Sequence, residues 1–170
     1  MIETLVCVLI LAVLISLAVP ELRNTLTRQR LHGVRNELIT SMHTARSEAM
    51  RRGVTVALQR RTDCTGLLTH RDDWSCGWRE VASDGLTESG NPATSEVMQS
   101  FDVPSGLQLL HPGGGEAMQF AASGQPLLVA SKFIVGPKMA AATPDAIRLT
   151  ATLCINRTGK IRTVEGQTLC

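Results

Sequence analysis

A single carboxylate stands at the head of the most apolar segment of the chain. Glu3 is followed by an almost unbroken apolar run over residues 5–19. A charged side chain at membrane depth costs on the order of 2.5 to 3.5 kcal/mol on insertion scales and usually marks a function. The natural partner for such a carboxylate is a free amine. Glu3 is therefore the first candidate for a functional residue.

Four cations gather near the C-terminus around one acid, Glu165. They are Arg148, Arg157, Lys160 and Arg162. A turn at Thr158–Gly159 would present them together. Clustered cations neutralise phosphates and release counterions without reading base sequence, which is the chemistry of non-specific DNA binding. The alternative is a hairpin end whose basic side chains are only solvated, because a formal net charge of +2 does not indicate nucleic-acid binding by the whole chain.

Four cysteines in the later part of the chain are suited to cross-linking. They are Cys64, Cys76, Cys154 and Cys170, whereas Cys7 lies in the apolar run. An even number suits two disulfides in an oxidising compartment. Proximity favours Cys64–Cys76 and Cys154–Cys170, although three pairings are possible and a zinc site is the alternative. No Cys-x-x-Cys pair is present, so we expect disulfides and a head that faces the periplasm or the outside.

The sequence contains no recognisable catalytic motif. The four histidines, at positions 32, 43, 70 and 111, have no metal-ligand spacing and no nucleophile motif beside them. The glycines at 113–115 lack the Lys-Ser/Thr that follows in a phosphate loop. We expect no enzyme activity, no metal and no cofactor.

Two helical segments precede the rest of the chain. Residues 1–20 read as a transmembrane or filament-core helix, and a cleaved secretory signal is the alternative. Residues 4–19 would span only roughly 24 Å against a hydrocarbon core of about 30 Å, so we expect a leader and a few residues upstream. Residues 21–53 repeat apolar side chains every three to five positions and read as an amphipathic stalk, with a bend expected at Pro20 and a stop at Gly53. The opposite, Arg-rich face of the stalk is either solvated or packed on other subunits.

Residues 54–170 read as one β-rich head. Short alternating or β-rich stretches separated by turn clusters indicate antiparallel strands. They cover residues 54–59, 78–82, 97–103, 107–110, 117–121, 127–135 and 147–155. Trp74 and Trp78 are either core side chains or a platform for base stacking, with core packing favoured. The predicted fold is α+β, with a long N-terminal helix packed on an antiparallel head.

The arrangement resembles the type IV pilins and the pseudopilins of type II secretion, with Glu3 at the position of their helix glutamate. The GspH/FimT branch is the most similar, because residues 45–53 read ARSEAMRRG, residues 73–78 read DWSCGW, and residues 159–162 read GKIR. That branch commonly has Gly-Arg-x-Arg near its end, so Lys160 stands in place of an arginine. The lysine keeps the charge but lacks the planar guanidinium that binds a phosphate bidentately.

This resemblance implies a pilin-like fold and a role in assembly for Glu3, which would pair with the terminal amine of a neighbouring subunit. It also implies an inner-membrane protein with one span, a prepilin peptidase that processes it, and other pilin or pseudopilin subunits as partners. In FimT proteins the similar C-terminal motif is implicated in DNA binding, which here would involve Arg148, Arg157, Lys160 and Arg162. The alternative is a GspH-like pseudopilin with a purely structural role, and the sequence leaves pilus and secretion system undecided.

Overall fold

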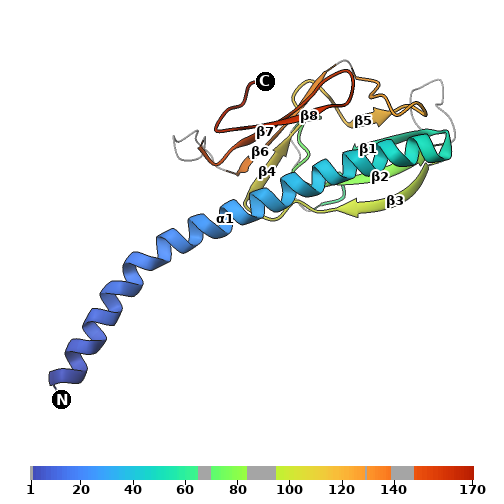
Figure 1. The fold of residues 1–170 in the computed structure, drawn as a ribbon. Coiled ribbons are helices and arrows are strands. Elements are labelled where there is room, and N and C mark those ends of the chain that lie inside the picture. The colour runs from blue at the N-terminus through green and yellow to red at the C-terminus, as the bar shows by residue number, and fades with distance from the viewer. Residues whose placement is uncertain (1, 65–69, 84–94, 129, 139–147) are drawn as a thin grey trace.

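A computed structural model describes residues 2–64, 70–83, 95–128, 130–138 and 148–170, which form one long helix followed by short strands (Figure 1). The helix is α1 (Ile2–Arg52). The strands are β1 (Thr55–Arg60), β2 (Trp78–Ser83), β3 (Ser95–Phe101), β4 (Leu107–Leu110), β5 (Ala117–Phe120), β6 (Ser131–Pro137), β7 (Ala151–Ile155) and β8 (Ile161–Glu165). The predicted α+β class, with a long helix on antiparallel sheets, is confirmed.

Helix α1 has a projecting half and a packed half. Its packed half buries one stripe at three- and four-residue spacing: Leu31, Val34, Leu38, Met42, Ala45 and Ala49. Leu26, which belongs to the predicted stripe, is 44% exposed because the helix has already left the head at that point. Gly53 ends the helix as predicted, with φ 69° and its N–H donating to the Ala49 carbonyl. The helix does not break at Pro20, and its projecting half curves (Figure 1).

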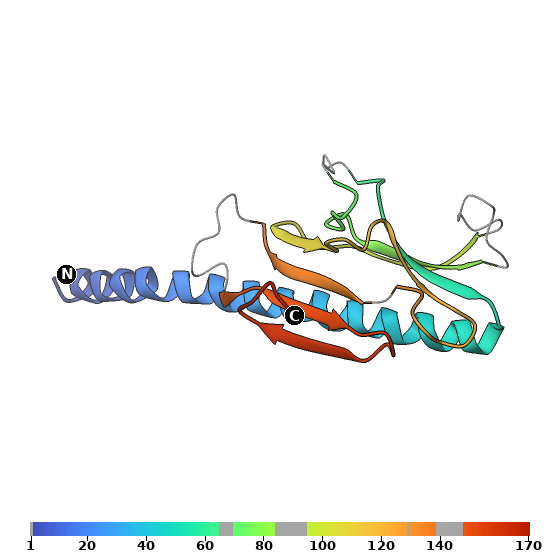
Figure 2. The same cartoon turned by 90° about the horizontal axis from the view of Figure 1, so that it is seen from above.

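Two four-stranded antiparallel sheets cover the packed half of α1. One has the order β3-β2-β1-β5 and the other the order β4-β6-β7-β8. Figure 2 shows both sheets alongside the C-terminal half of α1, while the N-terminal half extends beyond them. The contacts of α1 are mainly with β1 and β6, the inner strands that face its apolar stripe. Strand β8 is an edge strand, so its outer backbone groups have no partner in the sheet.

The two tryptophans lie in the core, as favoured from the sequence. Trp74 and Trp78 are fully buried. The indole Nε1 of Trp78 donates to Ser41 Oγ on α1 at 2.9 Å, and that of Trp74 donates to the Gly115 carbonyl at 2.9 Å. Their faces are therefore not available for base stacking.

The strand boundaries differ from expectation at three places. The predicted strand 127–135 begins only at Ser131 and continues to Pro137, and the predicted strand 97–103 runs from Ser95 to Phe101. The predicted strand 147–155 begins at Ala151, and residue 147 lies outside the described residues. Strand β8 was not expected, because Ile161–Glu165 has neither alternation nor an apolar run.

Candidate functional site

A tight hairpin joins β7 to β8 and carries most of the C-terminal cations. Asn156 organises its turn: Oδ1 accepts the N–H groups of Thr158 and Lys160 at 3.1 and 2.9 Å. Gly159 closes the turn with φ 77° and donates its N–H to the Asn156 carbonyl. Only glycine adopts this conformation readily, so the turn expected at Thr158–Gly159 is a well-defined structural unit.

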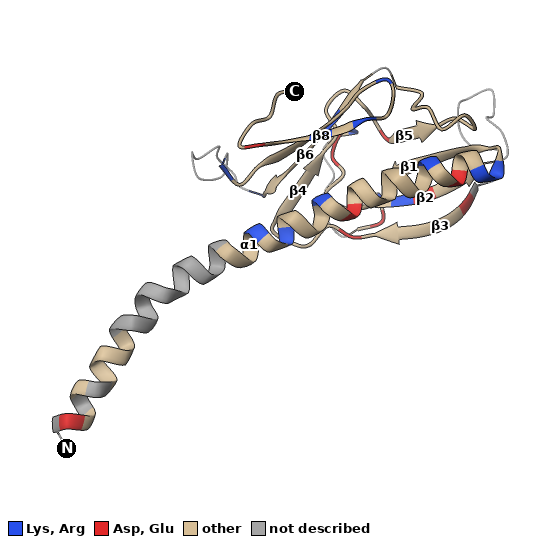
Figure 3. Cartoon of the chain, in the orientation of Figure 1, with Lys and Arg blue, Asp and Glu red and all other residues tan. Residues whose placement is uncertain are grey.

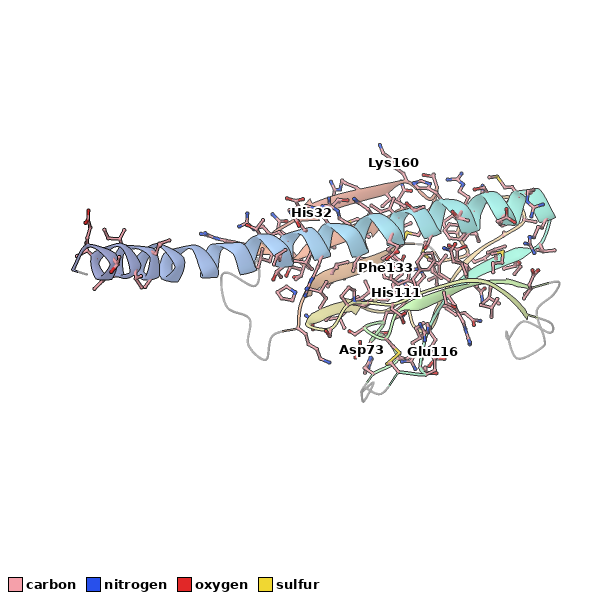
Figure 4. The ribbon with its side chains drawn as sticks, turned by 90° about the horizontal axis from the view of Figure 1, so that it is seen from below. His32, Asp73, His111, Glu116, Phe133 and Lys160 are labelled. Atoms are coloured by element: carbon pink, nitrogen blue, oxygen red, sulfur yellow. A yellow bond between two sulfur atoms is a disulfide. The ribbon has the colours of Figure 1, made fainter. Side chains whose placement is uncertain are left out.

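Three cations lie on this hairpin end, and we call Arg157, Lys160 and Arg162 the basic tip. All three are exposed. Arg162 pairs with Cys154 across the strands, so it projects from the face of the sheet opposite α1. Figure 4 shows Lys160 at the end of the hairpin, pointing away from the head. Within the described ranges of the chain, no carboxylate forms an ion pair with any of the three.

Arg46 on α1 adds a fourth cation at the hairpin end. Its Nη1 donates to the Thr158 carbonyl at 3.4 Å, and the same nitrogen lies 3.1 Å from where a Cβ on Gly159 would be. This contact was not predictable from the sequence, because Arg46 and Thr158 lie far apart along the chain. The only available signal was that Arg46 belongs to the basic face of the stalk, which was expected to be solvated or to contact other subunits.

Arg148 lies at the other end of the hairpin from the basic tip. It precedes β7, whose first residue Ala151 pairs with Glu165 at the end of β8. There it lines a pocket with Arg28 and Arg35 of α1. The five residues of β7 alone, at about 3.3 Å per residue, place roughly 15 Å between Arg148 and Arg157. The structure therefore brings together three of the four predicted cations and not the fourth.

The two disulfides are present, Cys64–Cys76 and Cys154–Cys170, with Cα–Cα distances of 5.7 and 5.8 Å. The second bond ties the C-terminal tail across the outer face of β7. On that face Thr152 is fully buried, and its Oγ1 donates to the Gln167 carbonyl of the tail. Lys132 Nζ from the neighbouring β6 also donates to the Thr168 carbonyl, at 3.2 Å. The tail is thus fixed to the outer face of β7 from Thr152 to Cys154, next to Arg162 of the basic tip.

Glu3 lies in the first turn of α1, at the far end of the projecting half. Its side chain is exposed, and Figure 3 shows this acidic residue at the tip of the helix, remote from the head. Within the described part of α1, no stretch qualifies as long and apolar enough to cross a membrane. Among the described residues of the head, none forms an ion pair with Glu3.

The histidines take no part in a common site. His111 is fully buried, and its ring stacks on Phe133 with centroids 4.0 Å apart (Figure 4). Burial lowers the pKa of His111 to about 4, so the ring is neutral at pH 7. His32 lies on α1 and His70 on a surface turn. Among the described residues, no three metal-binding side chains lie together.

The family model described as Type II transport protein GspH matches residues 35–168. The chain belongs to the GspH family of minor pilins and pseudopilins. Members of this family are structural subunits and not enzymes, and other pilin subunits are their partners in a membrane-associated or pilus assembly. No curated protein sequence matches the chain.

Two solved structures have a similar fold. The type IV minor pilin FimU of Pseudomonas aeruginosa is 21% identical, with a TM-score of 0.58 over 82% of this chain and 91% of FimU. The minor pseudopilin EpsH of the Vibrio cholerae type 2 secretion system is 14% identical, with a TM-score of 0.51 over 76% of this chain and 92% of EpsH. At these identities the likeness concerns the fold, so this GspH-family chain resembles both a pilus and a secretion subunit.

Proposed function

We propose that the chain is a FimT-type minor pilin that is incorporated into a type IV pilus and binds DNA non-specifically through the basic tip. The observation that carries the proposal is the set of three exposed cations on one hairpin end, with no carboxylate paired to them in the described residues. An unpaired cation is free to replace the counterions of a phosphate, whereas a cation in an ion pair must first lose its partner. Arg46 supplies a further charge beside the same turn.

The basic tip is suited to contacts with the DNA phosphates and not to recognition of the bases. Lys160 offers a point charge and Arg157 and Arg162 offer planar forks, and each can contact a phosphate without regard to base sequence. Both tryptophans are buried, so the described head has no tryptophan with which to stack unpaired bases. Three phosphate contacts give a log-log salt slope of roughly −2.7 on duplex DNA, which implies weak binding per subunit. Several subunits along one filament would raise the avidity.

In the proposed function, helix α1 anchors the chain and takes part in assembly. Residues 1–20 anchor the chain in the inner membrane before assembly, with the disulfide-bonded head in the oxidising periplasm. A prepilin peptidase removes a leader, and Glu3 then pairs with the terminal amine of an adjacent subunit in the filament. The exposure of Glu3 at the end of a projecting helix supports this role, because the carboxylate is reachable by another protomer.

A DNA-binding titration of the full chain in detergent tests the proposal. The test variant carries Arg157→Ala, Lys160→Ala and Arg162→Ala. The control removes the same charge elsewhere on the head with Arg71→Ala, Arg79→Ala and Lys138→Ala, three exposed positions. We expect fluorescence anisotropy to show binding by the wild type and the control, and at least a tenfold loss for the tip variant. Equal affinities for both variants, or no binding by the wild type, would refute DNA binding.

The second candidate is a pseudopilin with a purely structural role in a type II secretion system. It is favoured by the description of the matching family and by the fold shared with EpsH. It predicts no DNA affinity at any salt concentration. Deletion of the gene would then impair export of secreted proteins and leave pilus assembly and DNA uptake unchanged.

A further inference from the structure

A basic pocket lies between α1 and the base of the β7–β8 hairpin. Its floor is apolar, formed by Leu31, Leu149 and Ala151. Its rim carries three arginines, Arg28, Arg35 and Arg148, together with His32, Thr150 and Glu165. Its volume is about 170 Å³, well below the roughly 300 to 1,000 Å³ of sites for drug-sized ligands. The pocket therefore suits one small charged group and not a nucleotide.

One of the three arginines on the rim forms an ion pair, and the other two do not within the described residues. Arg35 Nη1 donates to Glu165 Oε1 at 2.9 Å, and the Arg35 side chain is only 17% exposed. This pair cancels the one acid that lines the pocket. Arg28 and Arg148 face the same pocket, are exposed, and have no ion pair within the described ranges. Two like charges held at one pocket repel each other unless an anion lies between them.

The pocket is also at a defined height along α1. Leu31 is where the helix first buries a described side chain against the head, so the pocket is at the end of the head nearest the projecting half. The apolar run ends at residue 19. At 1.5 Å per residue, Arg28 lies about 14 Å further along the helix axis. A bilayer's polar layer extends roughly 5 to 8 Å beyond its hydrocarbon core, and the charges of that layer act over about 8 Å in physiological salt.

We propose that this pocket binds a single phosphate group, with Arg28 and Arg148 as the two ligating cations and the Arg35–Glu165 pair as the fixed wall. Arginine forks match phosphate oxygens bidentately, and Arg28 and Arg148 have no carboxylate partner among the described residues, whereas the charge of Arg35 is offset by Glu165. The phosphate of an anionic phospholipid headgroup is the proposed occupant before the subunit leaves the membrane, because the pocket, although beyond the polar layer, is within the range of the surface charge of the membrane. The assignment of a lipid as the occupant rests on the proposed function, in which the chain is in the membrane before assembly. Binding of a phosphate group by the pocket does not depend on that function.

Thermal unfolding of the full chain in non-ionic detergent tests the site. The probes are sodium phosphate, dihexanoylphosphatidylglycerol and, as a zwitterionic control, dihexanoylphosphatidylcholine, all at matched ionic strength. A ligand at a hundredfold excess over its Kd that binds only the folded state should raise Tm by roughly 5 to 10 °C. We expect this rise with phosphatidylglycerol and a smaller rise with phosphate. Equal rises with these two probes would support the phosphate site with a free anion as its occupant.

Two double variants make the result specific. Arg28→Gln with Arg148→Gln should abolish the rise, and both side chains are exposed, so the variant should fold. Arg157→Gln with Lys160→Gln removes the same charge from the basic tip and should keep the rise, even if the tip proves to bind no DNA. A rise that survives in the pocket variant, or no rise with either phosphate or phosphatidylglycerol, would overturn the proposal. So would equal rises with the two lipids and none with phosphate.

Discussion

Arg46 Nη1 on the long helix donates to the carbonyl of Thr158 in the hairpin turn at 3.4 Å. This bond joins two segments that lie far apart in the sequence and gives the basic tip a support on α1. The bond is long and solvent-exposed, so its contribution to the free energy of unfolding is small. Its effect should appear in the geometry and charge of the tip.

The Arg46→Ala variant should weaken DNA binding without unfolding the head. We expect the Kd for DNA to rise about two- to tenfold, because one cation beside the proposed DNA-binding tip is lost. The free energy of unfolding should change by less than about 1 kcal/mol. Anisotropy titration and urea unfolding measure the two quantities. A Kd equal to that of the wild type would exclude Arg46 from the DNA-binding surface.

Removal of the Cys154–Cys170 disulfide, which joins the C-terminal tail to β7 beside Arg162, should cost more stability than any substitution at the tip. The Cys154→Ser, Cys170→Ser variant opens a loop with a sequence separation of 16. The chain-entropy estimate for such a loop is about 3 kcal/mol, which for a chain of this size lowers Tm by roughly 6 to 12 °C.

Differential scanning calorimetry under oxidising conditions measures this loss, with Cys64→Ser, Cys76→Ser as the comparison. The comparison variant opens a loop with a separation of 12 and should lose a similar amount. Only the first variant should also weaken DNA binding, because only it releases the tail that covers β7. Unchanged DNA binding by both would show that the tip does not depend on the tail.

His111 should make the fold sensitive to mild acid. Its pKa is about 4 in the folded chain and about 6.5 when unfolded, so the unfolded state binds the extra proton first as the pH falls. The resulting stability is fully present above pH 6.5 and is lost as the pH falls from 6.5 towards 4. Between pH 7 and 4.5 the loss from this group is about 2 to 3 kcal/mol.

The His111→Phe variant isolates this contribution, because phenylalanine keeps the stack on Phe133 and cannot be protonated. Urea unfolding at pH 7 and 4.5 gives the loss for each protein. Between pH 7 and 4.5 the free energy of unfolding should fall less in the variant than in the wild type. The difference between the two falls should be at least about 2 kcal/mol. Parallel pH dependences of the two proteins would mean that His111 is accessible to protons in the folded chain.

Glu3→Ala should affect assembly and leave the head intact. The exposed side chain lies in the first turn of α1, at the far end of the projecting half, so Tm of the head should not change. The variant should remain in the membrane fraction and be depleted from sheared filaments, because a neighbour's terminal amine has lost its carboxylate partner. Immunoblots of both fractions measure this, with Glu37→Ala as a control on the same helix.

The helix and the core were predictable because their signals are local. The stripe from Leu31 to Ala49 and the stop at Gly53 follow from three- and four-residue spacing and from a left-handed glycine. Strand β8 had no such signal. Its residues form a strand because β7 pairs with them and because Gly166 donates its N–H to the Thr150 carbonyl, both of which depend on the folded sheet.

The candidate site was predictable only in part. The turn at Gly159 placed Arg157, Lys160 and Arg162 together correctly, since all three lie within a few residues of it. Arg148 was grouped with them by its position in the sequence, but an intervening strand carries it to the far end of the hairpin. Arg46 could not be found from the sequence, because no local pattern tells which turn of a helix will meet a distant loop.

The salt dependence of DNA binding by the full chain tests the central claim most directly. The slope of log Kobs against log salt should be about −2.7 if the three tip cations each meet a phosphate of duplex DNA. The Arg157→Ala, Lys160→Ala, Arg162→Ala variant should retain little residual binding and a slope near zero. The Arg71→Ala, Arg79→Ala, Lys138→Ala control should keep the wild-type slope. A slope that is unchanged in the tip variant would contradict the claim that this hairpin end meets the DNA.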